Sequence, residues 1–102
     1  MHIECRHEGA TTWLAPTGEL DMVSGPLLLE HVERELTPGH VRHLVVDMAA
    51  VTFCDSAGIE ALLSARNAAT DRAATLRTVN VVGLARRTLE ITGMLDFLGG
   101  SD

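Results

Sequence analysis

Apolar positions along this chain either alternate with polar ones or run together in short stretches, a pattern typical of strands in a partly buried sheet. The strands expected from these stretches span residues 3–6, 11–17, 44–48 and 76–82. The first two are separated by the turn signal at residues 8–10, so we expect a hairpin. Pro16 lacks a backbone N–H, which places that part of the second strand at an edge or a bulge. A further short apolar patch spans residues 51–54.

The segments between these strands have the periodicity of helices. The first helix follows Ser24, a plausible N-cap, and the breakers at residues 37–39 end it. Its buried face is expected to consist of residues spaced four apart: Leu28, Val32 and Leu36. A second helix opens at Ser56 and runs to about Thr70. Its expected apolar positions are Ile59, Leu62 and Leu63.

The C-terminal part of the chain predicts a third helix and an apolar tail. The helix spans residues 84–92 and stops at Gly93. The tail is expected to fold back onto the core through Met94, Leu95, Phe97 and Leu98. The residues expected to be buried together between sheet and helices are Leu44, Val46, Leu62, Leu63, Leu76 and Val81.

A hairpin followed by alternating helices and strands is typical of the α/β class. We expect a single domain, residues 1–102, with a mixed β-sheet whose helices pack mainly on one face. Right-handed crossovers should link the later, parallel strands. The loops at residues 18–21 and at Ser56 precede successive helices, so they should lie near one another at one end of the sheet.

Composition narrows the possible functions. The chain has 102 residues, enough for one hydrophobic core, and 46% of them are hydrophobic. Aromatic residues make up only 3%, and the formal net charge is -6. Both values disfavour nucleic-acid binding, which relies on stacking aromatic side chains and on positive charge. No apolar run is long enough to span a membrane, and charged residues interrupt the N-terminus where a signal peptide would need an apolar stretch.

Cysteine and histidine spacing predicts neither a disulfide framework nor a metal site. Cys5 and Cys54 are the only cysteines, no Cys-x-x-Cys motif is present, and no histidine spacing matches a zinc ligand set. Both cysteines lie in strand-like apolar surroundings, where a free thiol behaves as a small hydrophobic residue. We therefore expect reduced, structural thiols in a cytoplasmic protein, with no metal and no cofactor.

Ser56 is the residue most indicative of function. It lies at the mouth of a helix, just past the carboxyl end of a strand, where backbone N–H groups and a positive partial charge are available. Asp55 or Ser56 could cap this helix with no further role, or Ser56 could be a phosphorylation site. Catalysis by Ser56 is disfavoured, because no histidine lies in a triad context and Cys54 occupies the first glycine position of a Gly-x-Ser-x-Gly elbow. An enzyme is therefore not expected.

An ordered set of motifs resembles the signatures of STAS domains, the sulfate-transporter and anti-sigma-factor-antagonist domains. The motifs are Gly18-Glu19-Leu20-Asp21, Val45-Val46-Asp47, Phe53-Cys54-Asp55-Ser56-Ala57-Gly58, Val79-Asn80 and Leu89-Glu90-Ile91-Thr92-Gly93. The resemblance covers nearly the whole chain, and the length is similar to that of stand-alone bacterial anti-sigma factor antagonists. In that family the serine of Asp-Ser-x-Gly is phosphorylated by the anti-sigma factor, itself a serine kinase. The matching residue here is Ser56.

The resemblance implies a partner-switching function. The unphosphorylated protein would bind a kinase-type anti-sigma factor and release a sigma factor; phosphorylation of Ser56 would switch it off, and a phosphatase would restore it. The expected partner-binding residues are Asp21, Ser24, Asp55, Ser56, Ala57 and Gly58. The alternative is a non-catalytic STAS adaptor module in a stress-signalling or lipid-transport complex. The sigma factor, the stimulus and the oligomeric state stay open.

Overall fold

The computed structural model describes residues 1–99, which form a mixed sheet covered by helices on one face. The strands are β1 (His2–Glu8), β2 (Thr11–Leu20), β3 (His43–Asp47), β4 (Val51–Cys54) and β5 (Thr75–Val79). The helices are α1 (Gly25–Leu36), α2 (Ser56–Asp71), α3 (Gly83–Ile91) and α4 (Met94–Phe97). The expected single-domain α/β fold is therefore confirmed.

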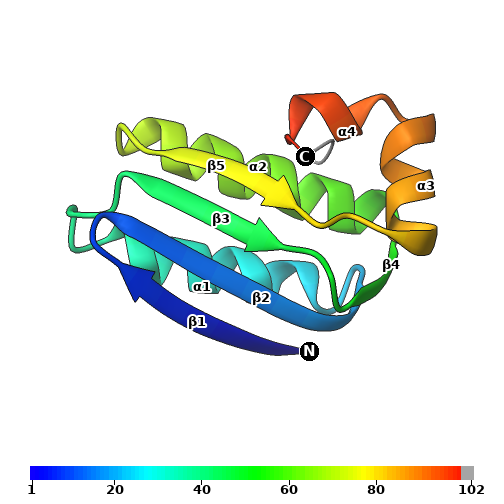
Figure 1. The fold of residues 1–102 in the computed structure, drawn as a ribbon, viewed down its shortest axis with the longest axis horizontal. Coiled ribbons are helices and arrows are strands. Elements are labelled where there is room, and N and C mark those ends of the chain that lie inside the picture. Colours follow the sequence, from blue (N-terminus) through cyan, green and yellow to red (C-terminus); the bar gives the residue numbers. More distant parts are fainter. Residues whose placement is uncertain (100–102) are drawn as a thin grey trace.

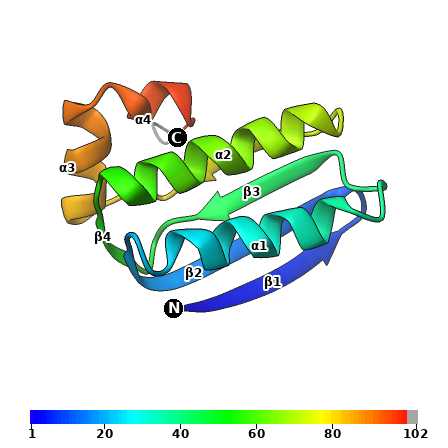
Figure 2. The ribbon, with the colours of Figure 1, turned by 180° about the vertical axis from the view of Figure 1, so that it is seen from behind.

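The sheet has five strands in the order β1-β2-β3-β5, with β4 paired to the far end of β2. β1 and β2 form the expected antiparallel hairpin, whereas the other pairs are parallel. Helices α1 and α2 lie side by side on one face of the sheet (Figures 1 and 2). Helix α3 packs against β4 at one end of the molecule, and α4 packs against α3.

The core is aliphatic and lies between the sheet and the two long helices. The predicted face of α1 is buried at Leu28, Val32 and Leu36. The predicted core residues Leu44, Val46, Leu62, Leu76 and Val81 are also buried, and Leu63 is partly buried against them. In the C-terminal tail Leu95 and Leu98 are buried as expected, Met94 is partly buried, and Phe97 is exposed with the Arg66 guanidinium over its ring.

The second strand is longer than predicted, and it lies between β1 and β3 in the sheet. It continues to Leu20, because its last residues pair with β4 instead of β3; the register of the pairing with β4 shifts between Gly18 and Glu19. The pairing to β3 ends at Leu14, and the pairing to β4 begins at Gly18. Pro16 lies between these two stretches, where β2 is paired with neither β3 nor β4. A strand with neighbours on both sides can accommodate a proline at such a position.

The fourth predicted strand is shorter than expected. The strand ends at Val79, because Asn80 adopts a left-handed conformation with φ of 56°. The Nδ2 of Asn80 donates a hydrogen bond of 3.0 Å to Oδ1 of Asp47, which joins this turn to the end of β3. Val81 is buried in the connection to α3 although it lies outside the strand.

Candidate functional site

The two loops expected to converge do so at the carboxyl ends of β2 and β4. We call residues 21–24 the Asp21 loop and residues 55–58 the Ser56 loop. Leu20 and Cys54 pair in register, and the backbone N–H of Asp55 donates to the carbonyl oxygen of Leu20 at 3.3 Å. One strand therefore ends in each loop, and the two helices that follow begin side by side (Figure 2).

Asp55, and not Ser56, caps helix α2. Asp55 has extended backbone angles, and its Oδ1 accepts a hydrogen bond of 2.9 Å from the backbone N–H of Gly58. This is the usual N-cap arrangement, in which a side-chain oxygen satisfies a first-turn donor. Ser56 is the first residue of the helix, and its side chain is exposed. Within residues 1–99 its hydroxyl makes no hydrogen bond, so capping does not occupy it.

Gly58 brings the Ser56 loop against the end of β2. A Cβ built at this position would lie well inside van der Waals contact with the carbonyl oxygen of Leu20, and 2.8 Å from Sγ of Cys54. Gly58 is also buried, so it does not itself present a side chain or an exposed surface. Its effect on any partner is therefore indirect: it allows α2 to begin at a distance from the sheet that no larger residue permits.

The Asp21 loop is held by a compact set of hydrogen bonds. Oδ1 of Asp21 accepts from the backbone N–H groups of Val23 and Ser24, each at 3.0 Å. The Ser24 hydroxyl lies 2.6 Å from the carbonyl oxygen of Glu19, to which it donates, and accepts from the Asp21 N–H at 2.9 Å. Ser24 is at the N-cap position as predicted, but its hydroxyl makes no capping bond to α1 and instead ties the loop to the end of β2.

The ionisation of two groups at this end of the sheet is shifted. The Ser24 N–H lowers the pKa of Asp21 most, and the Val23 N–H and the Ser24 hydroxyl lower it further, so the carboxylate is stabilised in its charged form. Burial raises the pKa of the Cys54 thiol to about 11, and the neighbouring charge of Asp55 adds to the increase. Cys54 is therefore an inert buried thiol, as expected. Cys5 does not follow that expectation, because it is exposed.

A shallow groove separates the two loops and extends between the first turns of α1 and α2. Its volume is about 360 Å³. Asp21 and Met22 line it on one side, and Ala57 and Glu60 line it on the other. The helices approach closely there, since a Cβ at Gly25 would lie 3.0 Å from that of Ala61. The groove therefore joins the predicted residues Asp21 and Ala57 in one surface.

Two exposed apolar side chains in the Asp21 loop were not singled out from the sequence. Met22 is 76% exposed and Val23 is 74% exposed, although both are large apolar residues. They follow Asp21 directly, and the hydrogen bonds to the Asp21 carboxylate fix the loop that presents them. The signal for this surface in the sequence is a Met-Val pair that belongs to no periodic apolar pattern. Large exposed apolar side chains grouped on a rigid loop are typical of protein-binding surfaces.

Comparison with protein families identifies the relatives of this fold. The sequence-family model of the STAS domain matches residues 2–101, nearly the whole chain. The chain belongs to the STAS family. A comparison with curated proteins returns no match.

Several solved STAS structures are similar to the chain. The anti-sigma factor antagonist SpoIIAA in its unphosphorylated form superposes with a TM-score of 0.78 at 17% identity, covering 91% of this chain and 82% of that one. An anti-sigma factor antagonist from Mycobacterium paratuberculosis gives a TM-score of 0.80 at 22% identity, covering 95% and 81%. The murine anion transporter Slc26a9 gives 0.74 at 16% identity, with 89% of this chain covering only 15% of the transporter.

These likenesses show the fold, which stand-alone antagonists and a transporter domain share. SpoIIAA is also similar in its phosphorylated form, with a TM-score of 0.70 at 17% identity over 91% of this chain and 85% of that chain. Within residues 1–99, no helix combines the length and hydrophobicity that crossing a bilayer requires. STAS domains of the antagonist type are in general binding modules without catalytic activity.

Proposed function

We propose that this STAS domain is an anti-sigma factor antagonist controlled by phosphorylation of Ser56. The observation that carries the proposal is the free, exposed hydroxyl of Ser56 at the first position of α2, with capping left to Asp55. A kinase can reach such a hydroxyl without unfolding the helix. Unphosphorylated, the protein binds a kinase-type anti-sigma factor in the cytoplasm and releases a sigma factor; a phosphatase reverses the modification.

The partner surface in this proposal consists of the Ser56 loop, the Asp21 loop and the groove between them. Met22 and Val23 supply apolar area, which contributes to association as it is removed from water. The Asp21 and Ser24 side chains act mainly by holding that loop in one conformation, because their polar atoms are already hydrogen-bonded to it. A rigid loop loses little conformational entropy on binding, which favours affinity.

Phosphorylation changes the charge of this surface without requiring a new fold. A phosphoserine adds about -1.5 to -2 charges at pH 7 and three strong acceptor oxygens. The N-terminus of α2 tolerates the added charge, because backbone N–H groups and the helix dipole favour anions there. The partner, however, meets a cluster that already contains Asp21, Asp55 and Glu60. Burying the phosphate beside them against apolar contacts carries repulsion and a desolvation penalty, so the complex dissociates.

Binding measurements with charge variants test the proposal. Ser56→Ala should bind the cognate anti-sigma factor as the unmodified protein does and should resist phosphorylation. Ser56→Asp places one negative charge at the same position and should bind at least tenfold more weakly. Asn67→Asp is the matched control. Asn67 is exposed on the same helix and lies eleven positions after Ser56, which corresponds to about 16 Å along the helix axis. It has the same net charge as Ser56→Asp and should bind normally.

Equal binding by Ser56→Asp and the unmodified protein would contradict the proposal, as would equal losses in Ser56→Asp and Asn67→Asp. Either result would favour the adaptor alternative, in which the STAS fold serves as an assembly module without a phosphoserine cycle. The similarity to the STAS region of an anion transporter shows that this fold also occurs in a larger protein of different function.

A further inference from the structure

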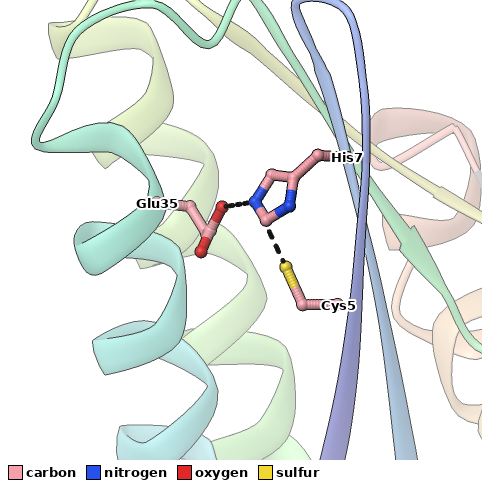
Figure 3. Close-up of side chains that lie close together, drawn as sticks. All are labelled: Cys5, His7 and Glu35. Carbon is pink, nitrogen blue, oxygen red and sulfur yellow. Dashed lines mark hydrogen bonds and ion pairs between the residues drawn. The ribbon is translucent and has the colours of Figure 1, made fainter.

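Three potential metal ligands converge at the edge of the sheet, far from the Ser56 loop. They are Cys5 and His7 on β1 and Glu35 on α1 (Figure 3). Sγ of Cys5 lies 3.6 Å from Nε2 of His7, and that same nitrogen lies 2.5 Å from Oε1 of Glu35. One ligand atom from each residue lies within 4.8 Å of the other two.

The fold creates this cluster from positions that sequence spacing does not connect. Cys5 and His7 are two residues apart on one strand, so their side chains leave the same face of the sheet. Glu35 lies in the last turn of α1, which covers that face beside the β1–β2 hairpin turn. His7 and Glu35 are 28 positions apart, which is why no short ligand motif is visible in the sequence.

The arrangement does not suit an acid–base relay of the cysteine–histidine–carboxylate type. A relay needs the thiol and the carboxylate on different ring nitrogens, so that one nitrogen takes the proton while the other is held. Here sulfur and oxygen both approach Nε2 of His7. Three electron-pair donors that approach one region are typical of the ligands around a bound cation. They are not typical of a proton-transfer chain.

We propose that Cys5, His7 and Glu35 form a binding site for a divalent transition-metal ion of the zinc type. A thiolate, an imidazole and a carboxylate are the three ligand classes that zinc takes in proteins. With metal–sulfur and metal–nitrogen bonds of about 2.3 and 2.0–2.1 Å, tetrahedral geometry sets the sulfur–nitrogen separation at about 3.6 Å. The separation of Sγ of Cys5 and Nε2 of His7 has that value.

The Glu35 carboxylate has to move for a metal to enter. The tetrahedral separation of nitrogen and oxygen is about 3.4 Å, so the Glu35 carboxylate must withdraw by about 1 Å from His7. Glu35 is partly exposed, and its Oε1 also lies 3.5 Å from Oγ1 of the buried Thr12, which limits the positions it can take. The contact with Thr12 orients the Glu35 carboxylate before the metal arrives.

Metal binding at this site is coupled to release of one proton. A cysteine thiol is ordinarily protonated at neutral pH, whereas the thiolate is the form that binds a metal. A divalent cation forms a bond to the thiolate, and the thiol proton leaves to solvent. Three protein ligands leave the fourth coordination position to water or to a donor from another molecule.

Titration of the tag-free, reduced, metal-free protein with cobalt(II) tests the site, because cobalt(II) replaces zinc and reports thiolate ligation by an ultraviolet charge-transfer band. We expect the band to saturate at one equivalent of cobalt and to disappear on addition of zinc. It should be absent in Cys5→Ser. Zinc affinity, measured by competition with a chromophoric chelator, should fall at least tenfold in His7→Gln and in Glu35→Gln.

Matched controls separate this site from adventitious binding. Cys54→Ala should keep the band, because Cys54 is buried elsewhere. His40→Gln and Glu33→Gln change exposed residues outside the cluster and should leave zinc affinity unchanged. These two surface variants serve as controls even if Cys54→Ala is destabilised. A wild-type protein without the band at excess cobalt, or a band that persists in Cys5→Ser, would overturn the proposal.

Discussion

Substituting Gly58 by alanine tests whether the close approach of α2 to β2 is structurally required. The new methyl group would overlap the carbonyl oxygen of Leu20 and would lie 3.1 Å from the carbonyl carbon. These are backbone atoms of a paired strand, so they cannot rotate away as a side chain can. The Ser56 loop would have to move outward, which weakens the bond between the Asp55 N–H and Leu20 O.

The expected loss of stability follows from two opposing terms. Overpacking a tightly packed site costs about 1–3 kcal/mol. Replacing glycine by alanine in a helix returns at most about 1 kcal/mol. Because the clash at Gly58 is with backbone, we expect Gly58→Ala to lower the free energy of unfolding by about 1–2 kcal/mol. For a domain of this size the melting temperature should fall by about 5–15 °C.

Gly25→Ala provides the matched comparison. It also adds a methyl group in the first turn of a helix, but its nearest neighbour is the Ala61 methyl at 3.0 Å, on a helix that can shift by a few tenths of an ångström. We expect it to cost less than about 1 kcal/mol. Urea denaturation followed by circular dichroism measures both. A Gly58→Ala protein as stable as the parent, or a larger loss in Gly25→Ala, would refute the argument.

Four further substitutions test the core, the cap and the loop. Leu62→Ala removes a fully buried side chain and should cost about 2–5 kcal/mol in urea denaturation; an unchanged midpoint would contradict its packing. Asp55→Ala should cost about 0.5–2 kcal/mol through loss of the N-cap, whereas Ser56→Ala should cost less, and the reverse order in thermal melts would assign the cap to Ser56. Because the Ser24 N–H lowers the pKa of Asp21 below its ordinary 3.8, the ionised carboxylate stabilises the fold above that pH. This contribution is lost as the pH falls through the lowered folded-state value, so Asp21→Asn should reduce the decline in stability below pH 3.8, and an unchanged profile would contradict it.

The elements with a strong local pattern were predictable from the sequence, and those set by pairing between strands were not. The buried face of α1 follows from a four-residue apolar repeat, and α3 ends before Gly93, which takes the left-handed conformation expected of a helix stop. The extension of β2 to Leu20 was missed because the segment from Gly18 reads as the loop that leads to the first helix. The strand continues through Gly18 because β2 exchanges one parallel partner for another between Leu14 and Gly18.

The candidate site was likewise predictable where a local motif indicates it, and not where contacts between distant segments decide it. A serine at the start of a helix was visible in the motif, but the sequence left open whether Asp55 or Ser56 is the cap. Deciding between them requires the hydrogen bond to Gly58. The cluster of Cys5 with His7 and Glu35 depends on how α1 packs over the edge of the sheet, so spacing along the chain could not indicate it.

The most direct test of the central claim is to map phosphate on the protein. The chain is incubated with its cognate anti-sigma factor kinase and ATP, digested, and analysed by mass spectrometry, with the Ser56→Ala variant in parallel. We predict one phosphate per molecule, located on Ser56, and no phosphate on the variant. Phosphate on Ser24, Thr52 or Ser64, or none on the parent protein while the kinase is active, would contradict the account.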